Sequence, residues 1–265
     1  MPLIILGLLH VYIGVRLLPD LASSPGVRIG GALLLVLSCA LMLAGLMSRS
    51  MQPRAVADRV AAVGLLAMSL FSSLFVFTLL RDFVLLLAIV ALPARHVHML
   101  VTLTAQLVVG LATFVTLVGF AGARRRARIV SVEVPLANLP PALQGFSIAQ
   151  ISDVHVGSQI KREYVDAIVD AVNGLDPDLI AVTGDLVDGS VHDLSLHIAP
   201  LGRLSARHGA FMVTGNHEYY SGERAWTAEF RRLGLHVLLN EHVVVRHGGA
   251  PLVVAGVTDY SAHHF

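Results

Sequence analysis

The chain has 265 residues, enough for a membrane region with one soluble domain or for two modest soluble domains. Hydrophobic residues make up 55% of it and charged residues 14%, a composition too apolar for an ordinary soluble protein. The formal net charge of +1 conceals halves of opposite sign: +8 up to Arg128 and −7 from Ile129 onward. Because polyanion binding needs a cationic surface, we expect no nucleic-acid partner for the acidic half.

Four apolar stretches in the basic half predict an α-helical membrane anchor of about four spans. They cover residues 3–18, 29–47, 60–80 and 97–120. The last three reach the roughly 20 residues that cross about 30 Å of hydrocarbon. The first is shorter and carries His10 and Arg16, so it is a marginal span, for which a cleaved signal peptide is the alternative.

The charges near these spans predict an anchor and its orientation. The spans contain almost no ionisable residues, so we expect no ion pathway, and we interpret Arg81 and Asp82 as an interfacial charge pair. A further apolar stretch at 83–92 either extends the third helix or forms a re-entrant segment. Arg residues gather in the loop after the second span and in the run at 124–128, so the positive-inside rule places the acidic half on the cytoplasmic side. Abundant Arg and Ala with a single Lys suggest a GC-rich bacterial genome, so we expect the membrane to be the bacterial inner membrane.

Composition divides the chain into three regions: a transmembrane helical region at 1–123, a basic exit segment and linker at 124–145, and a soluble α/β domain at 146–265. Within the linker, alternation at 129–134 predicts a strand. From residue 146 onward, strand and helix patterns alternate and indicate successive β-α-β units. The predicted strands are 146–151, 179–183, 210–214, 236–239, 243–246 and 252–257, and the predicted helices are 162–173, 193–206 and 224–233.

Metal-binding residue types follow each of the first three strands. Asp153 and His155 follow the first strand, Asp185 the second, and Asn216 and His217 the third. Right-handed crossovers make the strands parallel, so their carboxyl ends share one edge of the sheet. We therefore expect these side chains to lie together, although more than sixty residues separate the first from the last.

The segments that carry these residues read ISDVHVG, TGDLVDG and TGNHEYY. Each is weak alone, but their order and their spacing of about thirty residues resemble the first three signature blocks of calcineurin-like metallophosphoesterases. The resemblance runs from about Leu136 to Tyr260 and is most similar to the bacterial membrane-associated branch of that superfamily. It implies an α/β metallophosphoesterase domain, a β-sandwich flanked by helices on both sides.

The resemblance also implies roles for the strand-end residues. Asp153 and His155 would bind a first divalent metal ion, Asp185 would bridge two ions, and the amide oxygen of Asn216 would bind the second. Their carboxylate, imidazole and amide groups suit Mn, Fe or Zn. Two such ions about 3.5–4 Å apart clamp phosphate oxygens and activate a water as the nucleophile.

Two further residues are expected to be catalytic. By the same resemblance, His217 would stand near the substrate phosphate as a general acid or as a stabiliser of developing charge. Glu218 would orient His217 through a hydrogen bond, although its side chain is longer than the Asp often found in the family. The expected activity is metal-dependent hydrolysis of a phosphomonoester or phosphodiester at the membrane surface, with a lipid-linked phosphate as a candidate substrate.

The family has two further blocks, a single His and a G-H-x-H, after the segment that here ends at Tyr260. His263 and His264 lack that context, so we expect a chain truncated at its C-terminus and a domain incomplete there. On this expectation the 265 residues alone bind metals poorly and have little or no activity. The alternative is a non-catalytic binding or scaffold protein that retains a degenerate phosphoesterase fold.

Overall fold

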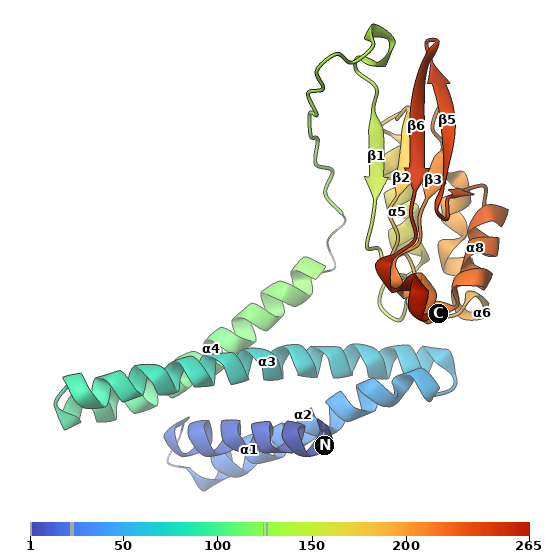
Figure 1. Cartoon of the computed structure of the whole chain (residues 1–265). Helices are drawn as coiled ribbons and strands as arrows, with labels where there is room; N and C mark the ends of the chain where they lie inside the picture. Colours follow the sequence, from blue (N-terminus) through green and yellow to red (C-terminus); the bar gives the residue numbers. More distant parts are fainter. Residues whose placement is uncertain (1, 22–23, 124, 126) are drawn as a thin grey trace. The chain divides into compact units, whose positions relative to one another are not determined.

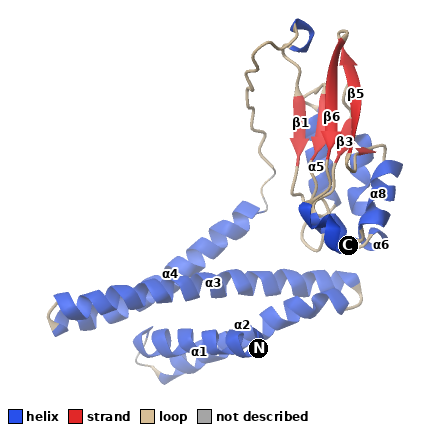
Figure 2. Ribbon diagram, in the orientation of Figure 1, coloured by secondary structure: helices blue, strands red, loops and turns tan. Residues whose placement is uncertain are grey.

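The computed structural model of the chain describes residues 2–21, 24–123, 125 and 127–265. It divides into two compact units, Met1–Arg125 and Arg126–Phe265 (Figure 1). The first unit is helical and the second contains all the strands (Figure 2). Two residues of the basic exit segment, Arg124 and Arg126, lie outside the described residues.

Four helices build the first unit, and all four are long and apolar enough to cross a membrane. They are α1 (Pro2–Leu21), α2 (Pro25–Met47), α3 (Arg54–Ala91) and α4 (Ala94–Ala123), with the short 3-10 helix η1 (Ser48–Ser50) after α2. The apolar stretch at 83–92 continues α3, which confirms one of the two predicted alternatives. At about 1.5 Å per residue, α3 is roughly 57 Å long, much longer than a hydrocarbon layer of about 30 Å.

Arg81 and Asp82, predicted to form a charge pair, lie in an ionic network of the first unit, with Arg81 Nη1 3.9 Å from Asp82 Oδ1. The Arg81 side chain is 1% exposed and pairs with Asp20 of α1. It also donates to the Arg16 carbonyl at 2.8 Å and to Thr104 Oγ1 of α4 at 3.1 Å. Asp82 also pairs with Arg16 and accepts a hydrogen bond from the Tyr12 hydroxyl. Burying a guanidinium requires this complete set of acceptors, so the network ties three helices together.

The second unit contains a four-stranded sheet, a two-stranded sheet and several helices. Its strands are β1 (Ile148–Ile151), β2 (Leu179–Val182), β3 (Ala210–Met212), β4 (His236–Val237), β5 (Glu241–His247) and β6 (Ala250–Gly256). Its α-helices are α5 (Arg162–Asn173), α6 (Val191–Ile198), α7 (Asn216–Ser221) and α8 (Glu223–Arg232). Its 3-10 helices are η2 (Pro141–Leu143), η3 (Ala199–Arg203) and η4 (Tyr260–His264).

The larger sheet is parallel and has the strand order β1-β2-β3-β4. Alternate residues of β2 point to opposite faces, as a pleated strand requires. Ile180 and Val182 pack with α5, α6 and α8, whereas Leu179 packs on the other face with residues of the antiparallel β5–β6 sheet. The parallel topology is as predicted. The fuller sandwich with helices on both outer sides stays a prediction.

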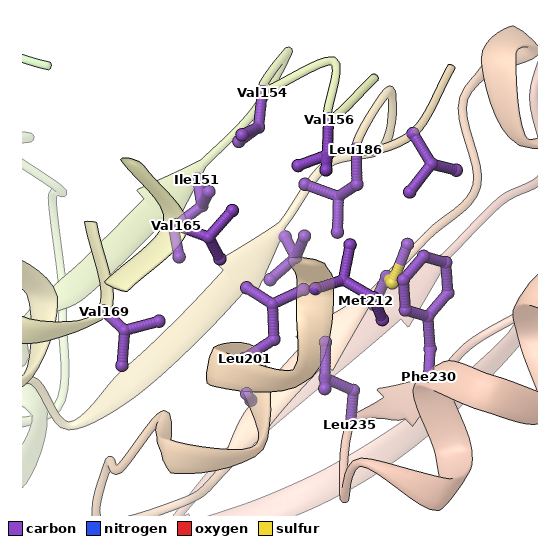
Figure 3. Close-up of a cluster of buried hydrophobic side chains, with 14 of the residues drawn as sticks. Ile151, Val154, Val156, Val165, Val169, Leu186, Leu201, Met212, Phe230 and Leu235 are labelled. Atoms are coloured by element: carbon purple, nitrogen blue, oxygen red, sulfur yellow. The ribbon is translucent and has the colours of Figure 1, made fainter. Parts of the chain in front are cut away.

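The main core lies between the parallel sheet and its helices (Figure 3). Val165 and Val169 of α5 and Phe230 of α8 are at most 1% exposed, and they belong to the same buried cluster as Met212 of β3. Their spacing along each helix gives one apolar stripe, which is why these segments are amphipathic helices. This core anchors the strands whose ends carry the candidate site.

The predicted strand at 129–134 is not formed. Residues 129–136 have no regular secondary structure, and Val130 and Val132 are 78% and 75% exposed. Alternation predicts a strand only where a neighbouring strand supplies backbone hydrogen bonds, and no such neighbour pairs with this segment among the described residues. Likewise, the helix predicted at 193–206 divides into α6 and η3, because Pro200 cannot continue an α-helix.

Asp178 connects strands at the end of the sheet opposite to the candidate site. Its Oδ2 accepts hydrogen bonds from the Ser147 backbone N–H at 2.9 Å and from the Ser147 hydroxyl at 3.2 Å. Arg207 forms an ion pair with its Oδ1 at 3.1 Å. These partners, led by the backbone N–H of Ser147, lower the pKa of Asp178. The carboxylate therefore stabilises the fold above the unfolded-state pKa of about 4, and this contribution is lost as pH falls further.

We expect Asp178→Asn to lower the free energy of unfolding by about 1–3 kcal/mol at pH 7 because charged hydrogen-bond partners are lost. The difference from the wild type should shrink below about pH 4. Urea unfolding followed by fluorescence of Trp226, the single tryptophan and a buried residue of this unit, measures it. Asp176→Asn, an exposed neighbour, is the matched control and should change little. An equal decrease in the free energy of unfolding at pH 3 and pH 7 would contradict the stabilising role of the ionised Asp178 carboxylate.

Candidate metal centre

The loops after β1, β2 and β3 leave the sheet side by side. Ile151 pairs in register with Val182, and Val182 with Met212, so the three strands end at the same level. The first two loops are also joined by backbone hydrogen bonds, from His155 N to the Asp185 carbonyl at 3.0 Å and from Val156 N to the Leu186 carbonyl at 2.8 Å. The predicted convergence of the strand ends is therefore present.

His155, Asp185 and His217 each offer one donor atom, and these three atoms lie within 4.8 Å of one another. All three residues are half-buried, so their side chains are packed on one side and accessible to solvent on the other. The two imidazole rings are 4.4 Å apart between centroids and nearly perpendicular, at 81°. Two imidazoles and a carboxylate are a donor set that divalent transition metals accept. His217, predicted as catalytic, therefore lies close to two of the predicted metal ligands.

The other two predicted ligands flank this group. Asp153 Oδ1 lies 3.9 Å from His155 Nε2, and its side chain is 68% exposed. One terminal atom of the Asn216 amide lies 3.2 Å from both carboxylate oxygens of Asp185. If the amide and the carboxylate are in direct contact, that atom is the amide nitrogen, which donates to the carboxylate. It can be the amide oxygen only if a cation lies between the two groups. Either assignment leaves Asn216 beside the carboxylate predicted to bridge two ions.

Unusual backbone conformations accompany the site. Asp153, His155 and Asp185 have φ values of 54°, 51° and 54°, in the left-handed region that non-glycine residues rarely adopt. Such conformations cost about 1–3 kcal/mol each and persist only where the surrounding structure enforces them. The hydrogen bonds between the loops supply that enforcement here.

Two glycines allow the loops after β2 and β3 to meet. A Cβ atom on Gly184 would lie 2.3 Å from the Gly215 nitrogen, and one on Gly215 would lie 2.2 Å from Asp185 Oδ1. Both distances are far inside van der Waals contact, so any side chain at either position would push the loops apart.

Glu218 differs from its predicted role. It is fully buried, and its two oxygens accept backbone hydrogen bonds from Asp185 at 2.9 Å, Leu186 at 2.8 Å and Gly215 at 2.8 Å. No hydrogen bond to the His217 ring is present among the described residues. Burial raises the pKa of Glu218, and the three N–H donors oppose that rise. Glu218 is therefore a positioning residue for the two loops, because its longer side chain reaches across to the β2 loop.

Asp188 performs the orienting role that was predicted for Glu218. Its Oδ1 hydrogen-bonds to Nδ1 of His217 and lies 3.3 Å from Nδ1 of His155. A proton on each Nδ1 leaves the Nε2 atom free to bind a cation or to exchange a proton. The motif TGDLVDG contains Asp188 three residues after Asp185. That second carboxylate in the same loop is the signal that could have identified it.

We expect Glu218→Gln to destabilise the second unit by about 2–3 kcal/mol, because the amide NH₂ of Gln meets backbone donors where a carboxylate oxygen accepted them. Urea unfolding at pH 7, again followed by Trp226 fluorescence, measures the effect. Glu163→Gln, the same change at an exposed position of α5, should shift the free energy by less than about 0.5 kcal/mol. Equal stability of the two variants would contradict the positioning role of Glu218.

Comparison with known proteins identifies the domain that carries these residues. Residues 146–263 match the calcineurin-like phosphoesterase family. This match confirms a calcineurin-like metallophosphoesterase domain in the second unit, as the three motifs predicted. No solved structure matches the chain.

Relatives of the chain occur in animals and in bacteria. A transmembrane protein with metallophosphoesterase domain from Bos taurus is 37% identical over 164 residues, which cover 59% of this chain and 37% of the relative. The zebrafish (Danio rerio) protein of the same description is 35% identical over 48% of this chain and 29% of its own length. An uncharacterized metallophosphoesterase of Helicobacter pylori is 38% identical over 54% of this chain and 37% of its own length. The chain thus spans about a third of these relatives, and the narrower bacterial branch stays a prediction.

Proposed function

We propose that the protein hydrolyses phosphate esters with the help of two divalent cations, held by Asp153, His155, Asp185 and Asn216. The observation that carries the proposal is the convergence of the His155, Asp185 and His217 donor atoms within 4.8 Å at one sheet edge. That edge belongs to a domain that matches a family of phosphoesterases.

The residues of the site fit divalent cations. Carboxylate and imidazole donors, without thiolate, suit Mn, Fe or Zn. The Asn216 amide, one terminal atom of which lies 3.2 Å from both Asp185 carboxylate oxygens, would present its oxygen to a bound cation. When bound, such ions neutralise phosphate oxygens and lower the pKa of a water molecule toward neutrality. They would also offset the negative charge of the domain, which otherwise repels a phosphate ester.

His217 contributes directly to bond cleavage. In hydrolysis the oxygen of a water molecule bonds to phosphorus, the bond from phosphorus to the leaving oxygen breaks, and the leaving oxygen takes up a proton. His217 supplies that proton from Nε2, while its Nδ1–H stays hydrogen-bonded to Asp188. Asp188 thereby selects the productive tautomer and stabilises the imidazolium before transfer.

The first unit supports action at a membrane surface. Its four apolar helices and the description of two relatives as transmembrane proteins favour membrane association. We propose that residues 1–123 anchor the protein, that 124–145 connect the anchor to the domain at 146–265, and that this domain faces the bacterial cytoplasm. A substrate held at the membrane, such as a lipid-linked phosphate, follows from that location.

Hydrolysis of p-nitrophenyl phosphate and bis(p-nitrophenyl) phosphate by the full-length protein in detergent tests the proposal. We expect Mn²⁺-dependent release of nitrophenol from at least one of them, and loss of kcat/KM by at least about 100-fold in Asp185→Ala. Asp170→Ala removes a carboxylate from the exposed face of α5 and should leave the rate unchanged. Hydrolysis by Asp185→Ala at the wild-type rate would refute the mechanism.

A further inference from the structure

An exposed aromatic ring lies beside the imidazole of His217. Tyr220 follows His217 by three residues in α7, so both side chains project from the same face of the helix. Their ring centroids are 5.7 Å apart and their planes are inclined by 68°. Tyr220 is 62% exposed, so most of its ring remains available to another molecule.

The neighbouring tyrosine shows that this exposure is specific to Tyr220. Tyr219 is half-buried, and its hydroxyl hydrogen-bonds with Thr214 Oγ1 at 3.3 Å. Tyr220 is more exposed, and both tyrosine rings lie near that of Phe265, with centroids 5.7 Å away for Tyr219 and 5.6 Å away for Tyr220. Two exposed aromatic rings in contact, next to a polar site, form an apolar surface that the packing of the core does not require.

The backbone that carries Tyr220 is fixed by the contacts of the site. α7 begins at Asn216, and Glu218 within it hydrogen-bonds to the backbone of both flanking loops. The helix ends at Gly222, which adopts a left-handed conformation with φ of 99°. A tyrosine on a fixed backbone has only two side-chain torsions to restrict, so it offers contact area at a low entropic cost.

We propose that Tyr220 is a specificity-determining residue that stacks on a planar aromatic ring carried by the leaving group of the substrate. This inference rests on the proposed function, because His217 can protonate the leaving oxygen only if the leaving group lies on its side of the phosphate. Tyr220 is an exposed ring neighbour of His217, so a leaving group beside His217 lies within reach of its ring. Stacking between an aromatic side chain and a planar ring favours esters of aryl alcohols or nucleosides over esters of small alkyl alcohols.

Two phosphonates that cannot be hydrolysed separate this inference from the proposed function. Phenylphosphonate and methylphosphonate carry the same anionic group, and only the first carries a ring. We measure both dissociation constants by calorimetry on the full-length, Mn²⁺-loaded protein. The wild type should bind phenylphosphonate about tenfold more tightly. Tyr220→Ala should remove that preference while its affinity for methylphosphonate stays unchanged, and Tyr220→Phe should retain the preference.

Further measurements identify each way in which the inference fails. Tyr260→Ala removes an exposed tyrosine that contacts His263 rather than His217, and it should keep the preference. Trp226 fluorescence checks that Tyr220→Ala remains folded, and Tyr220→Phe gives a second comparison if it does not. An undiminished preference in Tyr220→Ala, or no preference in the wild type, would overturn the role of Tyr220 alone. Failure of the wild type to bind either phosphonate would overturn the proposed function and this inference with it.

Discussion

The close approach of the loops after β2 and β3 is the constraint on which the candidate site depends. Gly184 and Gly215 meet with no room for a β-carbon, and the buried carboxylate of Glu218 joins the two loops through backbone N–H groups. This contact sets the position of Asp185, whose Oδ1 in turn accepts a hydrogen bond from the His217 backbone at 3.0 Å. A buried carboxylate with three backbone donors is therefore part of the support of the metal centre, although it has no contact with substrate in the proposed mechanism.

Much of the site could be predicted because local sequence patterns indicate where each strand ends and which strands follow one another. Short apolar runs followed by Gly, Asp and Asn indicate strands with tight turns, and parallel topology brings distant turns to one edge. That reasoning predicts that His155, Asp185 and His217 lie together, as the structure shows. Asp188 stands in the same motif as Asp185, so it could have been singled out as a second carboxylate, but its contacts with His155 and His217 could not. The contacts of Glu218 were equally inaccessible, because spacing along the chain does not reveal which side chain reaches across to another loop.

The same limit explains the errors elsewhere in the chain. The residues at 129–134 alternate like a strand, but pairing requires a partner that local pattern cannot identify. Arg81 pairs with Asp82 as predicted, but its further acceptors from α1 and α4, which lie 20 to 65 residues away in the sequence, could not be identified from local pattern. The existence and apolar character of the four long helices, in contrast, follow from composition, although α3 extends from Arg54 to Ala91, well beyond the predicted span at 60–80.

The central claim is that this sheet edge holds divalent cations. Its most direct test is the number of Mn²⁺ ions bound per chain by the full-length protein, measured by equilibrium dialysis and metal analysis. The account predicts two ions for the wild type and for Asp170→Ala, and the loss of at least one ion in Asp185→Ala, because Asp185 is proposed to bridge both. Binding of two ions by Asp185→Ala with unchanged affinity would contradict it.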